Sequence, residues 1–126
     1  MKAVFIHKEK DLLIANVKNP FLARHDIKGK VERRGICGSD LHYFNHGGFG
    51  TTRLKEPMIL GHEVYGTVLE FGEAVENIEI GDLVAISPSR SCAACQFCLS
   101  GNSNYCNDMK FYGSAMPFPH IQGAFR

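Results

Sequence analysis

The chain has 126 residues, of which 44% are apolar and 21% are charged, and its formal net charge is +1. These values are typical of one soluble globular domain, and they argue against nucleic acid or an anionic membrane as a partner. The apolar runs are too short to span a bilayer, and the first residues do not have the pattern of a signal peptide.

The first half of the chain is predicted to form short strands and one helix. Apolar and β-forming residues predict strands over 1–7, 11–17 and 26–34. The first two are expected to form a hairpin, because a charged turn joins them and Asn19-Pro20 ends the second. A short helix is expected over 40–45, since Gly47 and Gly48 follow it as a stop signal, and 48–55 has the composition of a polar loop.

The second half is predicted to add more strands and no long helix. Apolar segments bounded by turn residues predict strands over 64–71 and 83–86, a short apolar piece over 58–60, and the start of another strand over 123–125. Pro88 is expected to end the regular structure, and 87–109 has no apolar periodicity. Many short strands and little helix predict a mainly β fold, a small and partly open barrel formed by one domain over 1–126.

Four of the five cysteines lie close together in the segment 87–109, namely Cys92, Cys95, Cys98 and Cys106. The odd total argues against a closed disulfide framework, and without a secretion signal the thiols are expected to stay reduced in the cytoplasm. Four thiolates at this spacing predict a structural zinc site that orders a lobe poor in apolar residues. An iron–sulfur cluster or free thiols are the alternatives, since clusters use similar cysteine spacings.

The fifth cysteine, Cys37, belongs to a second pattern that runs from Gly35 to Glu63. This pattern contains a thiol, the imidazole of His62 and the carboxylate of Glu63, which are donor types that Zn²⁺ accepts. A catalytic zinc takes three protein ligands and leaves one position for water or substrate. The alternative is a buried cysteine and a core histidine with no metal between them.

Four motifs occur along the chain in a defined order. They are Gly35-Ile36-Cys37-Gly38-Ser39-Asp40-Leu41-His42, Gly61-His62-Glu63-Val64-Tyr65-Gly66, Gly81-Asp82-Leu83-Val84 and the four-cysteine segment. Together they resemble the zinc-containing medium-chain alcohol and polyol dehydrogenases, and most of all the sorbitol and L-idonate 5-dehydrogenase branch. The resemblance covers nearly the whole chain and implies a chaperonin-10-like barrel with a structural zinc lobe over 87–109.

The resemblance also implies roles around a catalytic zinc. Cys37 and His62 would bind the metal, with Glu63 as a ligand or a close neighbour. Ser39 would take the proton of the substrate hydroxyl and pass it through the cofactor ribose to His42. Two aromatic residues match positions near the substrate pocket, namely Tyr43 and Tyr112. The alternatives are a surface carboxylate for Glu63, a helix N-cap for Ser39, a solvent-facing helix histidine for His42 and core packing for the tyrosines.

The expected function is that of the catalytic domain of a zinc-dependent polyol or secondary-alcohol dehydrogenase that uses NAD or NADP. The family's Gly-x-Gly-x-x-Gly turn has no match here, so the chain is expected to be the N-terminal piece of a longer, homo-oligomeric enzyme and to be inactive alone. Its partners would be a small alcohol and its own C-terminal Rossmann domain. Two alternatives are a zinc module that binds a partner without catalysis, and a quinone or enone reductase of the same superfamily, a group that usually lacks both zinc sites.

Overall fold

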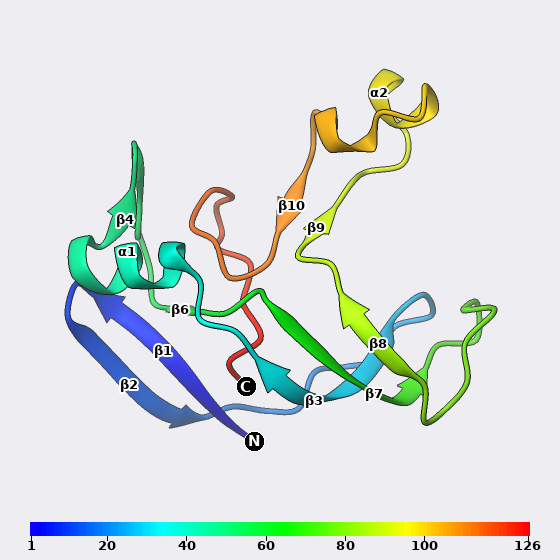
Figure 1. Ribbon diagram of the computed structural model, residues 1–126, viewed down its shortest axis with the longest axis horizontal. Coiled ribbons are helices and arrows are strands. Elements are labelled where there is room, and N and C mark those ends of the chain that lie inside the picture. Colours follow the sequence, from blue (N-terminus) through cyan, green and yellow to red (C-terminus); the bar gives the residue numbers. More distant parts are fainter.

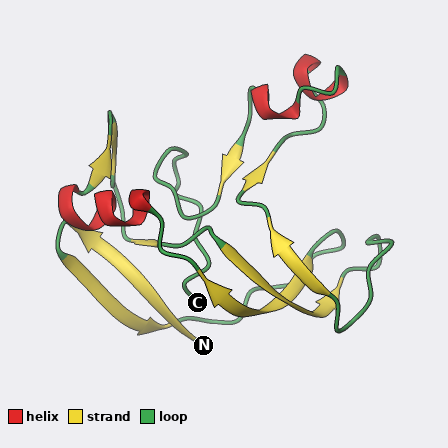
Figure 2. Ribbon diagram, in the orientation of Figure 1, coloured by secondary structure: helices red, strands yellow, loops and turns green.

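The computed structural model describes all 126 residues, which form two three-stranded sheets, two small two-stranded sheets and a lobe that projects from them (Figures 1 and 2). The first sheet has the order β2-β1-β6 and consists of β1 (Lys2–Lys8), β2 (Asp11–Asn16) and β6 (Met58–Ile59). Ile6 of β1 pairs with Met58 of β6, and both side chains are fully buried. This pairing fixes the start of the segment that carries His62.

The second sheet has the order β3-β7-β8 and consists of β3 (Ile27–Arg34), β7 (Val64–Phe71) and β8 (Leu83–Ile86). β3 runs antiparallel to β7, and Arg34 at the end of β3 pairs with Val64 at the start of β7. Cys37 follows the first of these strands and Glu63 precedes the second. The antiparallel pairing therefore brings two motifs together that are far apart in the sequence.

The helix α1 (Gly38–His46) begins directly after Cys37, which is its N-cap, and ends at Gly47 in the left-handed conformation. A small hairpin of β4 (Gly48–Phe49) and β5 (Thr52–Arg53) follows it. Neither this helix nor the shorter one in the lobe has the length and apolar character needed to cross a membrane.

The main core lies where α1 meets the first sheet. It contains Ile6, Tyr43, Met58, Leu60 and Ala115. Tyr43 is 1% exposed and packs edge to face against Phe49, with ring centroids 5.6 Å apart. Tyr43 lies on α1, which follows Cys37, and Leu60 lies two residues before His62. The core therefore holds the segment that carries Cys37 against the segment that carries His62.

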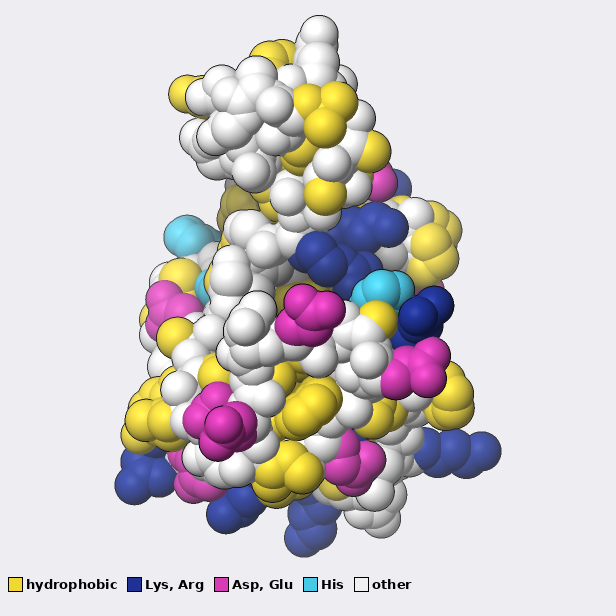
Figure 3. All heavy atoms as spheres, turned by 90° about the vertical axis from the view of Figure 1, so that its right-hand side faces the viewer, with side chains coloured by type: hydrophobic (Ala, Val, Ile, Leu, Met, Phe, Trp, Pro, Cys, Tyr) yellow, Lys and Arg dark blue, Asp and Glu magenta, His cyan; other side chains and the backbone are white.

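The lobe rises from β9 (Ser89–Arg90) and β10 (Lys110–Phe111), which pair with each other at its base. Between them lie α2 (Gln96–Leu99) and the 3₁₀ turn η1 (Ser103–Tyr105), which form the tip that stands above the sheets in Figure 1. Residues 91–107 contain no charged side chain, and the lobe in Figure 3 is accordingly white and yellow above a charged body.

Three backbone segments cross closely beside His62. A Cβ atom on Gly61, whose φ is +93°, would lie 2.1 Å from the ring of Phe125. A Cβ on Gly113 would lie 2.7 Å from the carbonyl oxygen of Gly61, and one on Gly123 would lie 2.4 Å from that of Leu60. Backbone hydrogen bonds join the same segments, from Phe125 N to Leu60 O at 3.0 Å and from Ala124 N to Gly61 O at 2.8 Å. Glycine is required here because there is no room for a side chain.

Most predicted elements are confirmed, and three predictions are wrong. The strands over 64–71 and 83–86 have the predicted bounds, and the sheets do not close into a barrel, as expected of a partly open one. Residues 123–125 form no strand, because their backbone hydrogen bonds are divided between the segment 59–61 and Val4 and make no regular ladder with one strand. The loop at 48–55 contains the β4–β5 hairpin. Regular structure also continues past Pro88, in β9, β10 and the two short helical turns of the lobe.

Candidate metal centres

The four cysteines of the lobe surround one point. Their sulfurs lie within 4.8 Å of one another, and none forms a disulfide. Sγ of Cys98 lies 3.6 Å from Sγ of Cys95 and 4.0 Å from Sγ of Cys92. Four sulfurs around one zinc, each about 2.3 Å from the metal, are roughly 3.8 Å apart. The lobe therefore fits a single zinc ion, whereas a four-iron cluster puts each sulfur on a different iron and spreads them further apart.

Backbone N–H groups point at these sulfurs and change their pKa values. The N–H of Cys98 is the main cause that lowers the pKa of Cys95 to about 6, and the N–H of Ala94 is the main cause that lowers the pKa of Cys92. Cys106 also accepts the N–H of Cys92 at 3.2 Å, but burial and the neighbouring sulfurs of Cys92 and Cys98 raise its pKa to about 11. Cys95 is therefore largely a thiolate at neutral pH, which is the form that binds metal.

The second cluster consists of Cys37, His62 and Glu63, whose donor atoms lie within 4.8 Å of one another. Cys37 is half-buried, His62 is 9% exposed and Glu63 is exposed. Thiolate, imidazole and carboxylate form a donor set that suits Zn²⁺, and three donors on one side leave a coordination position open. The cluster thus fits a catalytic rather than a closed structural metal site.

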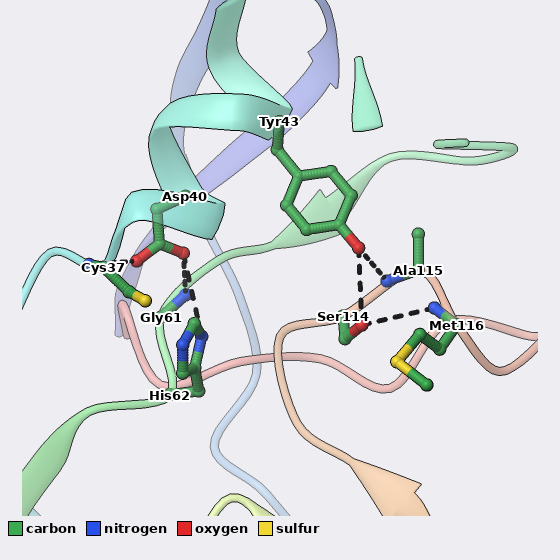
Figure 4. A network of polar contacts seen from close by, with 8 residues as sticks. All are labelled: Cys37, Asp40, Tyr43, Gly61, His62, Ser114, Ala115 and Met116. Atoms are coloured by element: carbon green, nitrogen blue, oxygen red, sulfur yellow. Dashed lines mark hydrogen bonds and ion pairs between the residues drawn. The ribbon is translucent and has the colours of Figure 1, made fainter. Parts of the chain in front are cut away.

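The carboxylate of Asp40 lies between Cys37 and the segment of Gly61 and His62, as Figure 4 shows. Its carboxylate is 4% exposed and accepts the backbone N–H of Cys37 at 3.0 Å and that of Gly61 at 3.3 Å. Nδ1 of His62, which is buried without a hydrogen-bond partner, lies 3.9 Å from Oδ1 of Asp40. One buried carboxylate therefore holds the two segments that carry the thiol and the imidazole.

Sequence reasoning did not assign Asp40 to the site. It is the third residue after the helix N-cap, where an acidic side chain returns a hydrogen bond to the N-cap backbone. An acidic residue three positions after a predicted N-cap is the sequence signal that could have identified the contact of Asp40 with Cys37. Its contact with Gly61 depends on the tertiary fold.

The imidazole of His62 also touches the base of the lobe. Its ring packs edge to face against Phe111 of β10, with centroids 5.4 Å apart. Since β10 pairs with β9 below the four cysteines, the packing of the lobe is connected to the orientation of His62.

An open groove of about 610 Å³ lies beside this cluster. Gly35, His62 and Glu63 lie in its wall together with Arg33 and Arg34. The rest of the wall comes from the second sheet and the segment after it, from Val64, Tyr65, Ala85, Ile86 and Pro88. A small molecule in this groove would therefore lie beside two residues of the cluster, His62 and Glu63.

The other predicted site residues lie in three different environments. Ser39 is half-buried in the first turn of α1, and its alternative role as N-cap is wrong because Cys37 occupies that position. His42 is exposed on the same helix. Tyr43 lies in the core, where its hydroxyl oxygen accepts the N–H of Ala115 at 2.7 Å, and Tyr112 is half-buried after β10. The proton-transfer and substrate-contact roles stay predictions.

Residues 23–126 match the family model described as the alcohol dehydrogenase GroES-like domain. The match covers both cysteine-containing patterns and most of the chain. The chain belongs to this family.

Within the GroES-like family, two curated relatives and one solved structure are similar to this chain. It is 48% identical over 96 residues to L-idonate 5-dehydrogenase (NAD(P)(+)) of Escherichia coli, which covers 76% of this chain and 27% of that protein. It is 36% identical over 125 residues to sorbitol dehydrogenase of Bacillus subtilis, which covers 99% of this chain and 34% of that protein. The crystal structure of L-idonate 5-dehydrogenase from E. coli matches with a TM-score of 0.89 and 39% identity, over 98% of this chain and 35% of that one. The chain therefore spans about a third of the length of these relatives.

Proposed function

We propose that the chain is the zinc-binding catalytic domain of an NAD(P)-dependent dehydrogenase that acts on polyols or secondary alcohols. The observation that supports this most directly is the cluster of Cys37, His62 and Glu63 beside an open groove, with Asp40 behind it. The names of the relatives, L-idonate 5-dehydrogenase and sorbitol dehydrogenase, support a polyhydroxylated substrate.

Zinc bound by Cys37 and His62 would supply Lewis-acid chemistry that lowers the pKa of an alcohol hydroxyl. Ser39 would receive the hydroxyl proton in the first turn of α1 and pass it towards His42, which is exposed to solvent on the next turn. Glu63, at the exposed edge of the cluster, would complete the negative charge around the metal. We propose that Glu63 either binds the zinc directly or lies next to its ligands.

A hydride acceptor is the second requirement, and nicotinamide enzymes bind it on a separate nucleotide-binding unit. We place NAD or NADP on such a unit, a C-terminal Rossmann domain, in a cytoplasmic and homo-oligomeric enzyme. On this proposal the 126-residue chain alone oxidises no alcohol, because nothing holds the nicotinamide against the substrate carbon.

The test is a steady-state assay of the whole protein that contains this chain, with NAD and NADP and a panel of sugar alcohols, sugar acids, secondary alcohols and ethanol. A polyhydroxylated or secondary alcohol should have the highest kcat/KM, since the polar side chains of the groove wall can hydrogen-bond several hydroxyls and ethanol offers only one. Cys37→Ser should abolish turnover. Ethanol as the best substrate, or steady turnover by the isolated chain above its own Cys37→Ser control, would refute the proposal.

A further inference from the structure

Two histidines lie one turn apart on the outer side of α1. His42 and His46 are both exposed, and their ring centroids are 5.8 Å apart at an interplanar angle of 37°. Residues four apart in a helix lie on the same side, so their side chains meet. The family resemblance implies a proton-acceptor role for His42, with a solvent-facing helix histidine as the alternative, and it implies no role for His46.

The helix cannot rotate to bury these rings. Tyr43, between them in the sequence, is 1% exposed and fixed by its hydrogen bond from Ala115. The C-terminal end of the helix is held by two further hydrogen bonds, from Gly47 N to Tyr43 O at 2.9 Å and from Lys10 N to Phe44 O at 2.6 Å. Both imidazoles are therefore presented to solvent from a fixed backbone.

The spacing of the rings is close to that of a chelate. When two imidazoles bind one ion through Zn–N or similar bonds of about 2.0–2.1 Å with a tetrahedral angle, their centroids are roughly 5 Å apart. The observed 5.8 Å is within about 1 Å of that value. The ion would also lie near the C-terminal end of the helix, where the backbone carbonyls favour a positive charge.

We propose that His42 and His46 form a third metal site, a two-imidazole chelate for a borderline transition-metal ion such as Ni²⁺, Cu²⁺ or Zn²⁺. Neutral imidazole is a preferred ligand of these ions, and a pair four residues apart on one helix face is a recognised arrangement for them. Water would complete the coordination, because no third donor group accompanies the pair.

Metal binding at this site would also affect catalysis, an inference that rests on the role of His42 in the proposed function. An ion bound by both imidazoles occupies the lone pair with which His42 would accept a proton. Excess metal would then inhibit the dehydrogenase at a point outside the catalytic zinc site.

Binding is tested by calorimetric titration of Ni²⁺ into a chain that carries Cys37→Ser and holds zinc in the four-cysteine lobe, so that the Cys37 cluster does not take up Ni²⁺. This chain, with both histidines of α1 present, should bind one Ni²⁺. His42→Gln and His46→Gln should each weaken this binding by on the order of 100-fold, since the second bond of a chelate forms intramolecularly. His25→Gln, an exposed histidine elsewhere, is the matched control and should change nothing. Unchanged Ni²⁺ binding in either of the first two variants would overturn the proposal.

Inhibition is tested in the whole protein. His46→Gln should keep the basal activity but lose most of the inhibition by added Ni²⁺, whereas His25→Gln should stay sensitive. Equal inhibition of His46→Gln and wild type would refute a regulatory role for the site. If the whole protein oxidises no alcohol, the proposed function fails, while the calorimetric result still decides whether the chelate exists.

Discussion

Oδ1 of Asp40 lies 3.9 Å from Nδ1 of His62, and both side chains are buried. This distance is longer than a hydrogen bond, yet Nδ1 has no other partner. A small rotation of the imidazole would let Nδ1–H donate to the carboxylate and leave Nε2 for a metal, which is how second-sphere carboxylates orient ligating histidines.

Asp40→Asn should weaken zinc binding at the Cys37 cluster by about 10–100-fold, because the neutral amide no longer orients and polarises His62. It should leave zinc in the four-cysteine lobe. Competition with a chromophoric chelator measures both affinities. Asp82→Asn is the matched control, since Asp82 also accepts a backbone N–H, that of Glu79 at 2.8 Å, but lies away from the cluster. Equal zinc affinity in the two variants would show that Asp40 only caps the helix.

The two metal centres should differ in how tightly they hold zinc. After dialysis we expect close to one zinc per chain, in the lobe, where all four ligands are present. Cys92→Ser should lose this zinc and destabilise the fold, because the lobe has little apolar burial of its own. Cys37→Ser should lose only the zinc that binds when more is added. Elemental analysis decides this, and loss of the tight zinc from Cys37→Ser alone would reverse our assignment.

The zinc affinity of the lobe should depend on pH in two regimes. With its pKa lowered to about 6, Cys95 is a thiolate above pH 6 and releases no proton when zinc binds. Below pH 6 it must lose one, so the plot of log affinity against pH should steepen by about one unit there. Cys106, with a pKa of about 11, releases a proton in both regimes. A constant slope from pH 5 to 8 would show that the thiols titrate as in an unfolded loop.

Tyr43→Phe should destabilise the fold by about 1–3 kcal/mol without changing the zinc content. The substitution removes the hydroxyl oxygen that accepts the buried N–H of Ala115, and an unsatisfied buried donor costs about this much. Urea unfolding measures the change. Tyr105→Phe, at a side chain that is 66% exposed, is the control and should alter stability by less than about 0.5 kcal/mol. A loss of zinc in Tyr43→Phe would instead connect this residue to the site.

The strands of the second sheet could be predicted because their signals are local. Residues 64–71 and 83–86 are apolar, β-forming runs with turn residues beside them, and both have the predicted bounds. The segment 123–125 has a similar local composition but forms no strand. Its backbone partners are Val4 and the segment 59–61, which are far away in the sequence, and these contacts cannot be predicted from local composition.

The candidate site could be predicted as a set of donors but not as an arrangement. Cys37, His62 and Glu63 were recognised from residue type and motif, and the pairing of β3 with β7 explains why they meet. The second role of Asp40 depends on Gly61, which approaches only when the core forms. The sequence allows Tyr43 a place near substrate or in the core, and its burial in the core depends on tertiary packing.

The close crossing at Gly61, Gly113 and Gly123 limits how this site can evolve. One scaffold can host different chemistries when the side chains of its site change. A side chain at any of these three glycines would instead push one backbone segment away from the others and move His62 with it. New specificities in this scaffold are therefore expected to come from substitutions in the groove wall, at Arg33 and Arg34. The three glycines beside His62 are expected to stay glycine.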